Sequence, residues 1–191
     1  MSSKKILKLP GKNLEISKKA AIKNAENIKD ASTVYINGFL GISAFLLRGA
    51  KWYMPSFWRM LIAHAESGRL LSIDRVKDEL LRADLEAWAK GTFREFFAST
   101  SDQDIIAAYR EVMSWSQNQV QFTDSAKAEF ASVADGWLIA YALAKGCIVV
   151  THEQFDPNIK RKVKIPNACH AFCVDYVDAF QMMRELGVRL G

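Results

Sequence analysis

Residues 131–155 read ASVADGWLIAYALAKGCIVVTHEQF, an apolar segment that opens with an acid and turns at a glycine into a short β-branched run. The apolar spacing predicts a helix over 134–145, and the run at 148–150 predicts a buried strand. With about 1.5 Å rise per helical residue and about 3.3 Å per strand residue, the two elements have comparable lengths. The turn at the glycine between them makes the helix and the strand run antiparallel. The stretch therefore predicts that Asp135 and Glu153 meet at one edge of a sheet.

Short apolar runs alternate with amphipathic segments along the rest of the chain. Residues 34–36 predict a first strand and residues 172–174 a last one. Helical patterns begin at residues 55 and 72, with Ser72 as a predicted N-cap, recur within 92–130 and close the chain at 178–186. This alternation predicts an α/β fold with a central parallel sheet of about four to five short strands, flanked by helices that predominate.

The positive charge of the chain is concentrated at its N-terminus. The sequence has 26 Lys and Arg against 21 Asp and Glu, and residues 1–30 alone hold eight Lys and three acids. We therefore interpret residues 1–33 as a Lys-rich N-terminal extension and residues 34–191 as one domain. Such an arm can contact RNA or DNA phosphates, although the pattern is also typical of a solvated segment.

The cysteines and the uncharged run at 31–47 indicate the cellular compartment of the protein and whether it contains a membrane span. An odd count of three cysteines argues against a disulfide framework and favours a reducing, cytoplasmic setting. Cys169, His170 and Cys173 lack a fourth ligand at the spacing expected for zinc. The run at 31–47 is at the lower limit of a membrane span and contains polar residues, so we interpret it as a buried strand plus a helix, with no membrane partner.

Asp135 has two interpretations from the sequence alone. It shares a helix face with Leu138 and Ile139, and a carboxylate on an apolar face needs a partner such as a divalent metal. Alternatively, Ser132 and Asp135 have the spacing of a capping box ahead of an apolar run. The convergence of Asp135 and Glu153 at the carboxyl end of a strand favours the metal site, because open α/β sheets bind ligands there.

Two further residues are candidates for the same site. Glu79 stands one residue before an apolar position in VKDELL and therefore borders the predicted core, although a solvated helix acid is the ordinary alternative. Asn37 follows the first strand, and its carbonyl oxygen can bind a hard cation without bringing charge. The pair Asn-Gly is also a common way to end a strand.

Six segments, taken in order and spacing, resemble the PIN domain, and specifically a PIN-like group of uncharacterised bacterial proteins. They cover roughly residues 50–191. The segments are PSFWRML at 55–61, E-x-G-R-L at 66–70, SIDRVKDELL at 72–81 with the tryptophan of LEAWAK after it, ADGWLIAYALAKGCIVVTHE at 134–153, KVKIPNAC at 162–169 and FQMMRELG at 180–187.

This resemblance implies a compact α/β fold in which three or four acids bind Mg²⁺ or Mn²⁺. Many PIN domains are ribonucleases, including the VapC-like toxins of bacterial toxin–antitoxin pairs. By position, Glu79, Asp135 and Glu153 match family acids, and Thr151 leads the turn before the last one. The resemblance thus implies a metal-dependent endoribonuclease with an RNA substrate, and a protein antitoxin and a homodimer as partners.

A basic loop follows Glu153 closely. It carries Lys160, Arg161, Lys162 and Lys164, which we predict to contact the RNA backbone, with a solvated turn as the alternative.

The first strand departs from the family pattern. PIN domains usually end it with Asp, and the matching position here is Asn37. Loss of that charge supports a second hypothesis, in which a catalytically weakened PIN-fold protein acts by binding RNA or a protein.

Overall fold

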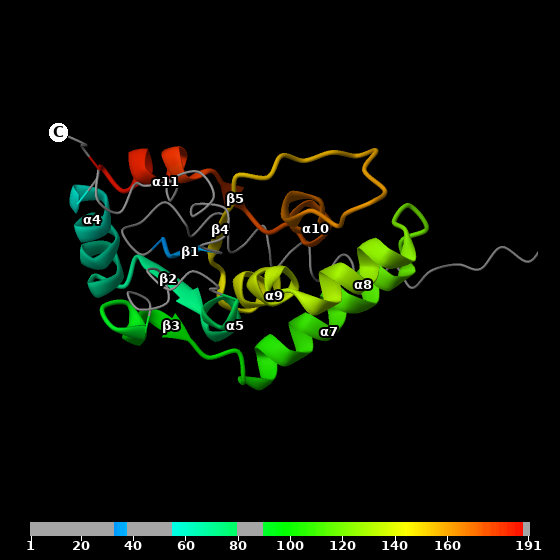
Figure 1. The fold of residues 1–191 in the computed structure, drawn as a ribbon, viewed down its shortest axis with the longest axis horizontal. Coiled ribbons are helices and arrows are strands. Elements are labelled where there is room, and N and C mark those ends of the chain that lie inside the picture. Colours follow the sequence, from blue (N-terminus) through cyan, green and yellow to red (C-terminus); the bar gives the residue numbers. More distant parts are fainter. Residues whose placement is uncertain (1–32, 38–54, 80–89, 189–191) are drawn as a thin grey trace, which may run out of the picture. The chain divides into compact units, whose positions relative to one another are not determined.

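Five short strands form one parallel sheet in the part of the chain that the computed structural model describes, residues 33–37, 55–79 and 90–188 (Figure 1). Their order is β3-β2-β1-β4-β5, and each neighbouring pair is parallel. The strands are β1 (Tyr35–Asn37), β2 (Leu70–Ile73), β3 (Phe97–Ala98), β4 (Ile148–Val150) and β5 (Tyr176–Val177). Because all strands are parallel, their carboxyl ends share one edge of the sheet.

Helices make up most of the remaining described chain. They are α4 (Pro55–Glu66), α5 (Asp74–Asp78), α7 (Gln103–Asn118), α8 (Asp124–Ser132), α9 (Asp135–Lys145), α10 (Ile165–Phe172) and α11 (Ala179–Glu185), with a 3-10 turn, η1 (Arg94–Phe96). This architecture confirms the predicted helix-rich α/β class with a parallel central sheet, and it is consistent with a PIN-like fold. The predicted extension, apart from Thr33, and the helix expected after β1 lie outside the described residues.

The unit formed by α9 and β4 has the predicted geometry. Helix α9 ends at Lys145, where Gly146 takes the left-handed conformation (φ 70°) and donates its N–H to the Ala142 carbonyl at 2.8 Å. The chain then reverses into β4, whose three residues are all buried. The start of α9 consequently lies beside the carboxyl end of β4, because the two elements run in opposite directions.

Close packing against α7 fixes the position of the first turn of α9. A Cβ atom added at Gly136 would lie 2.4 Å from the Cε of Met113 and 3.3 Å from a ring carbon of Tyr109. The next residue, Trp137, stacks on Tyr109 with ring centroids 3.7 Å apart and planes 6° apart. The backbone that carries Asp135 is therefore held against α7 on one side, while α9 packs against β1 and β4 on the other.

The predicted strand at 172–174 is wrong. Phe172 is the last residue of α10, Cys173 takes a left-handed conformation (φ 53°) after it, and the strand lies at Tyr176–Val177. Pro166 lies in the first turn of α10, where its fixed φ suits a helix and its missing N–H costs nothing. Of the three residues at 172–174 only Val174 is buried, and it lies between the end of α10 and β5.

The N-cap prediction for Ser72 is also wrong. Ser72 lies inside β2 and is fully buried, and Ile73 precedes α5. Strand β2 pairs with β1 on one side and β3 on the other. Pairing on both sides is a tertiary feature, and it overrides the local preference of Ser for a helix N-terminus.

Ser132 and Asp135 do not form a capping box. Ala134 occupies the N-cap of α9 without a side-chain hydrogen bond, and the Ser132 hydroxyl donates to the Glu129 carbonyl instead. The Ala134 N–H donates to Glu79, 55 positions earlier in the chain. The start of α9 is therefore satisfied by a tertiary contact, and Asp135 has no local capping role.

No helix among the described residues is long and apolar enough to cross a membrane.

Gly146 provides a test of the α9–β4 reversal. A Cβ added there would meet no atom within 4 Å, so the cost of a side chain comes from the left-handed backbone alone. We expect Gly146→Val to lower the free energy of unfolding by about 1–2 kcal/mol. The control Gly146→Asn should cost clearly less, because Asn tolerates this conformation. Urea unfolding measures both, and equal costs would contradict this account of the turn.

Candidate functional site

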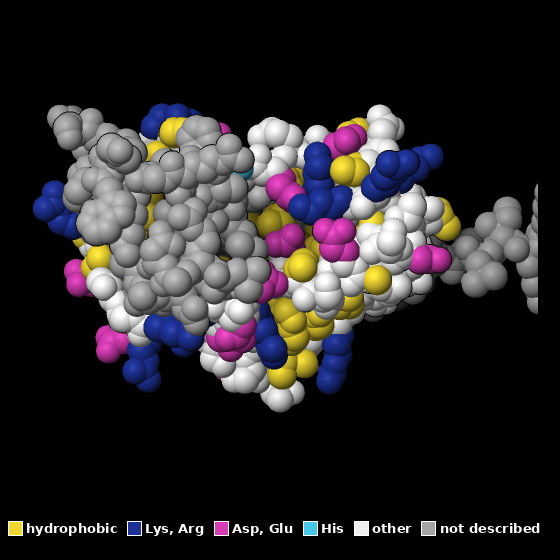
Figure 2. Space-filling model, viewed as in Figure 1, with side chains coloured by type: hydrophobic (Ala, Val, Ile, Leu, Met, Phe, Trp, Pro, Cys, Tyr) yellow, Lys and Arg dark blue, Asp and Glu magenta, His cyan; other side chains and the backbone are white. Residues whose placement is uncertain are grey.

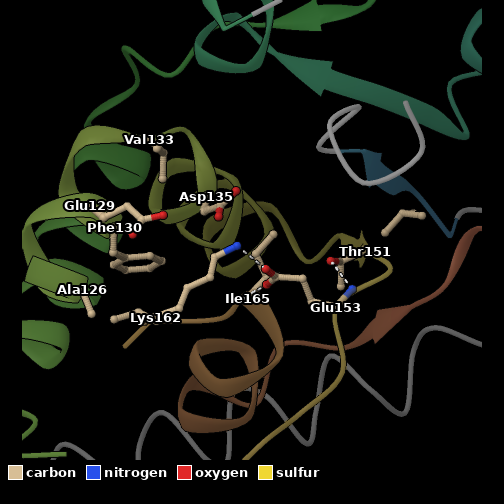
Figure 3. A pocket seen from close by; sticks show the side chains of 11 residues that line it. Ala126, Glu129, Phe130, Val133, Asp135, Thr151, Glu153, Lys162 and Ile165 are labelled. Carbon is tan, nitrogen blue, oxygen red and sulfur yellow. Dashed lines mark hydrogen bonds and ion pairs between the residues drawn. The ribbon is translucent and has the colours of Figure 1, made fainter. Parts of the chain in front are cut away.

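A pocket of about 280 Å³ opens at the carboxyl end of β4 (Figure 3). Asp135 reaches it from α9, Thr151 and Glu153 from the segment after β4, and Lys162 from the loop that leads to α10. The full lining consists of Ala126, Glu129, Phe130, Val133, Asp135, Val150, Thr151, Glu153, Lys162, Val163 and Ile165. Figure 2 shows acidic and basic side chains close to one another on the face viewed in Figure 1. Charged groups thus meet at the sheet edge where α/β proteins place their ligands.

Asp135 is the most strongly perturbed acid in this pocket. Burial raises its pKa to about 6, and the neighbouring carboxylate of Glu153 adds to the increase. Lys162 acts in the opposite direction, and Glu79 and Glu129 contribute smaller increases. These effects show that several carboxylates are close enough to Asp135 to disfavour its negative charge.

Glu79 joins the site from α5. It is the C-cap residue of that helix, and its Oε1 accepts the Ala134 N–H at 2.5 Å, directly beside Asp135. Its Oε2 is buried and has no hydrogen-bond partner among the described residues. Burial raises the pKa of Glu79, while the bond from Ala134 lowers it. A buried carboxylate oxygen without a donor is a costly arrangement that an additional ligand would relieve.

Glu153 has both carboxylate oxygens engaged. Its Oε1 lies 2.6 Å from the Lys162 Nζ, and its Oε2 accepts the Ile165 N–H at 2.8 Å, at the start of α10. The Thr151 hydroxyl oxygen accepts the Glu153 N–H at 3.2 Å, so Thr151 shapes the turn that carries Glu153. Figure 3 shows the Lys162 amine pointing into the pocket toward Glu153.

Lys162 keeps its positive charge in these surroundings. Burial alone lowers its pKa, but the hydrogen bond to Glu153 and the charges of Glu153, Asp135 and Glu129 together raise it. An ammonium group is therefore the counter-ion of the acidic pocket in this structure.

The four predicted RNA contacts differ in their positions. Lys160 and Arg161 are exposed, whereas Lys164 donates to the Gln154 carbonyl at 3.2 Å and Lys162 lies in the pocket. The loop backbone is anchored to the α7–α8 connection, since the Thr123 N–H donates to the Lys160 carbonyl at 2.9 Å. The exposed pair thus stands on an anchored loop beside the acids.

Asn37 ends β1 at the same edge. It is in register with Val150 of β4, and β1 also pairs with β2, the strand that precedes α5 and Glu79. The side chain of Asn37 lies outside the described part of the structure. Its backbone therefore ends at the same edge of the sheet as β4.

The donor set suits a hard divalent cation. Carboxylate and hydroxyl oxygens are the ligands that Mg²⁺ and Mn²⁺ prefer, and the unpartnered Glu79 Oε2 is a buried oxygen with free lone pairs. Among the described residues, no three acidic, His or Cys side chains are already grouped as a metal site. One of the acids, Glu153, is paired with Lys162 instead.

Two contributions to the pocket were missed in the sequence. Glu129 lines it from α8, and Lys162 faces inward rather than outward. Glu129 is separated from Asp135 by a break between two helices, so no single period connects them. Lys162 is chemically equivalent to its neighbour Arg161 in the sequence, and only the path of the loop distinguishes them.

Fold and site together define an α/β protein with an acidic pocket at the carboxyl edge of a parallel sheet. The model of the family described as "Domain of unknown function (DUF4411)" matches residues 50–190, and the chain belongs to this family. No curated protein and no solved structure matches the chain. The resemblance to PIN domains stays a prediction.

The raised pKa of Asp135 predicts a specific pH dependence of stability in metal-free protein. Because the folded-state pKa is about 6, above that of an unfolded Asp, the stabilisation is complete below about pH 4 and is lost as the pH rises through 6. Asp135→Asn should therefore stabilise the protein by up to about 3 kcal/mol more at pH 7.5 than at pH 4.

Urea unfolding in the presence of a chelator measures this difference. The control is Asp175→Asn, since Asp175 is exposed and does not line the pocket, and its effect should stay within about 0.5 kcal/mol at both pH values. An effect of Asp135→Asn that is the same at pH 4 and pH 7.5 would contradict a raised pKa of Asp135 in the folded protein.

Proposed function

We propose that this protein is a metal-dependent endoribonuclease of PIN type that hydrolyses phosphodiester bonds in RNA with Mg²⁺ or Mn²⁺. One observation carries the proposal: Asp135 lies in the pocket close to the carboxylates of Glu153 and Glu79, and burial first, then these carboxylates, raise its pKa. Like charges held together in this way are costly unless a cation joins them. A structural role would be served better by neutral groups.

In this proposal the metal would be held by Asp135, Glu79 and Glu153, with Asn37 as a neutral ligand from β1. A bound divalent ion would supply a water of lowered pKa and positive charge toward the scissile phosphate. Ala134 orients Glu79 through its N–H. Thr151 sets the turn that aims Glu153.

The surroundings of the pocket agree with an RNA substrate. Lys160 and Arg161 are exposed on the loop that follows Glu153, where they would contact backbone phosphates without reading sequence. The proposed setting is cytoplasmic, which agrees with the free thiols of all three cysteines. A protein antitoxin and a homodimer belong to the same proposal, as expected for a toxin of a toxin–antitoxin pair.

A second candidate is a PIN-fold protein with weakened catalysis that acts by binding RNA or a protein. The ion pair at 2.6 Å between Lys162 and Glu153 favours it, since the pocket already holds a cation of its own. The amide at Asn37, in place of the usual acid, acts in the same direction.

Cleavage of single-stranded RNA in Mg²⁺ or Mn²⁺ tests the first candidate. We expect the wild type to cleave and Asp135→Asn to lose at least about 100-fold, because several kcal/mol of charge stabilisation depend on the metal site. Asp175→Asn is the control and should cleave like the wild type. An Asp135→Asn variant that cleaves RNA as fast as the wild type, or wild-type cleavage that persists in a chelator, would contradict a metal-dependent nuclease.

Asn37→Asp separates the two candidates in the same assay. If the amide has weakened the site, cleavage should appear only in this variant, because the added carboxylate restores charge at the end of β1. If the wild type already cleaves, the first candidate stands.

A further inference from the structure

Lys162 is placed differently from the other basic residues of its loop. Its Nζ lies 2.6 Å from the Glu153 Oε1, inside a pocket that Asp135 and Glu129 also line. The side chains of Lys162 and Glu153 are 45% and 23% exposed, so the ion pair is only partly screened by solvent. Lys164, two residues on, donates to a backbone carbonyl instead.

The backbone on both sides of Lys162 is anchored. The Lys160 carbonyl accepts the Thr123 N–H, Val163 is buried, and the Ile165 N–H donates to the Glu153 Oε2 at 2.8 Å. The four-carbon stem of a lysine can rotate about its own bonds without moving such a backbone. The ammonium can therefore leave the pocket while the loop stays in place.

Departure of the ammonium would leave Glu153 in a defined position. Its Oε2 keeps the bond from the Ile165 N–H, and its Oε1 is released toward the pocket. Together with Asp135 and the unpartnered Oε2 of Glu79, this would add a third carboxylate to the oxygen set. A divalent cation and the Lys162 ammonium therefore compete for the same carboxylate.

We propose that Lys162 is a built-in counter-ion that occupies the acidic pocket in the metal-free protein and has to leave Glu153 before a divalent cation binds. This inference rests on the metal-site part of the proposed function and extends it to regulation: metal affinity is set by the release of a lysine. Neutral replacement of Lys162 removes the competitor and leaves the acids unchanged.

Calorimetric titration of the full chain with Mn²⁺ alone tests the inference without RNA or catalysis. We expect Lys162→Gln to bind Mn²⁺ at least about fivefold more tightly than the wild type, corresponding to an ion pair of about 1 kcal/mol. Lys164→Gln is the matched control, with the same charge change in the same loop, and should stay within about twofold of the wild type. Lys162→Arg keeps the charge and should bind no more tightly than the wild type.

A thermal melt of each variant, with and without Mn²⁺, shows whether the variant is folded. Metal-free Lys162→Gln should melt lower than the wild type, and Mn²⁺ should raise its melting temperature by more than that of the wild type. Equal or weaker Mn²⁺ affinity in Lys162→Gln would overturn the inference, as would equal tightening in Lys164→Gln.

The outcomes also separate this inference from the nuclease proposal. If Lys162→Gln binds Mn²⁺ more tightly but the protein cleaves no RNA, the counter-ion inference is supported and the nuclease proposal is contradicted. If the wild type cleaves RNA and Lys162→Gln binds Mn²⁺ no more tightly than the wild type, the nuclease proposal is supported and the counter-ion inference is contradicted. Absence of Mn²⁺ binding in every variant overturns both.

Discussion

The packing of helix α9 positions Asp135 and, through the Ala134 N–H, Glu79. The helix is pressed against α7 at Gly136, where a methyl group would already meet Met113, and it covers β1 and β4 on another side. Leu138 and Ile139 are fully buried in this contact. Because α9 packs on both sides, it carries Asp135 at the carboxyl end of β4. Glu79 is held to the same place by its bond from the Ala134 N–H.

The carboxylates at this edge of the sheet repel one another, and the positive charge of Lys162 offsets part of this repulsion. Burial and like charges raise the pKa of Asp135, and an ammonium group 2.6 Å from Glu153 offsets part of the negative charge. Among the described residues, one carboxylate oxygen of Glu79 still has no hydrogen-bond donor.

Local patterns in the sequence were sufficient for the α9–β4 unit and insufficient for its neighbours. The acid, the apolar period, Gly146 and the β-branched run all indicate the same structure, so the prediction for this unit was correct. Ser72 has the local character of an N-cap, yet it is buried in β2 by pairing with strands on both sides. Residues 172–174 have the local character of a strand, yet Phe172 is the last residue of helix α10 and Cys173 caps it.

By itself, the sequence determined the α/β class, the reversal at Gly146 and the convergence of Asp135 with Glu153, because these depend on periodicity and on residues close together in the chain. Only the tertiary structure decided that Glu79 binds the Ala134 N–H, 55 positions away, and that Lys162 rather than Arg161 faces the acids. Such contacts depend on how separate elements pack and on the path of an anchored loop. Neither leaves a periodic trace in the residues that make the contact.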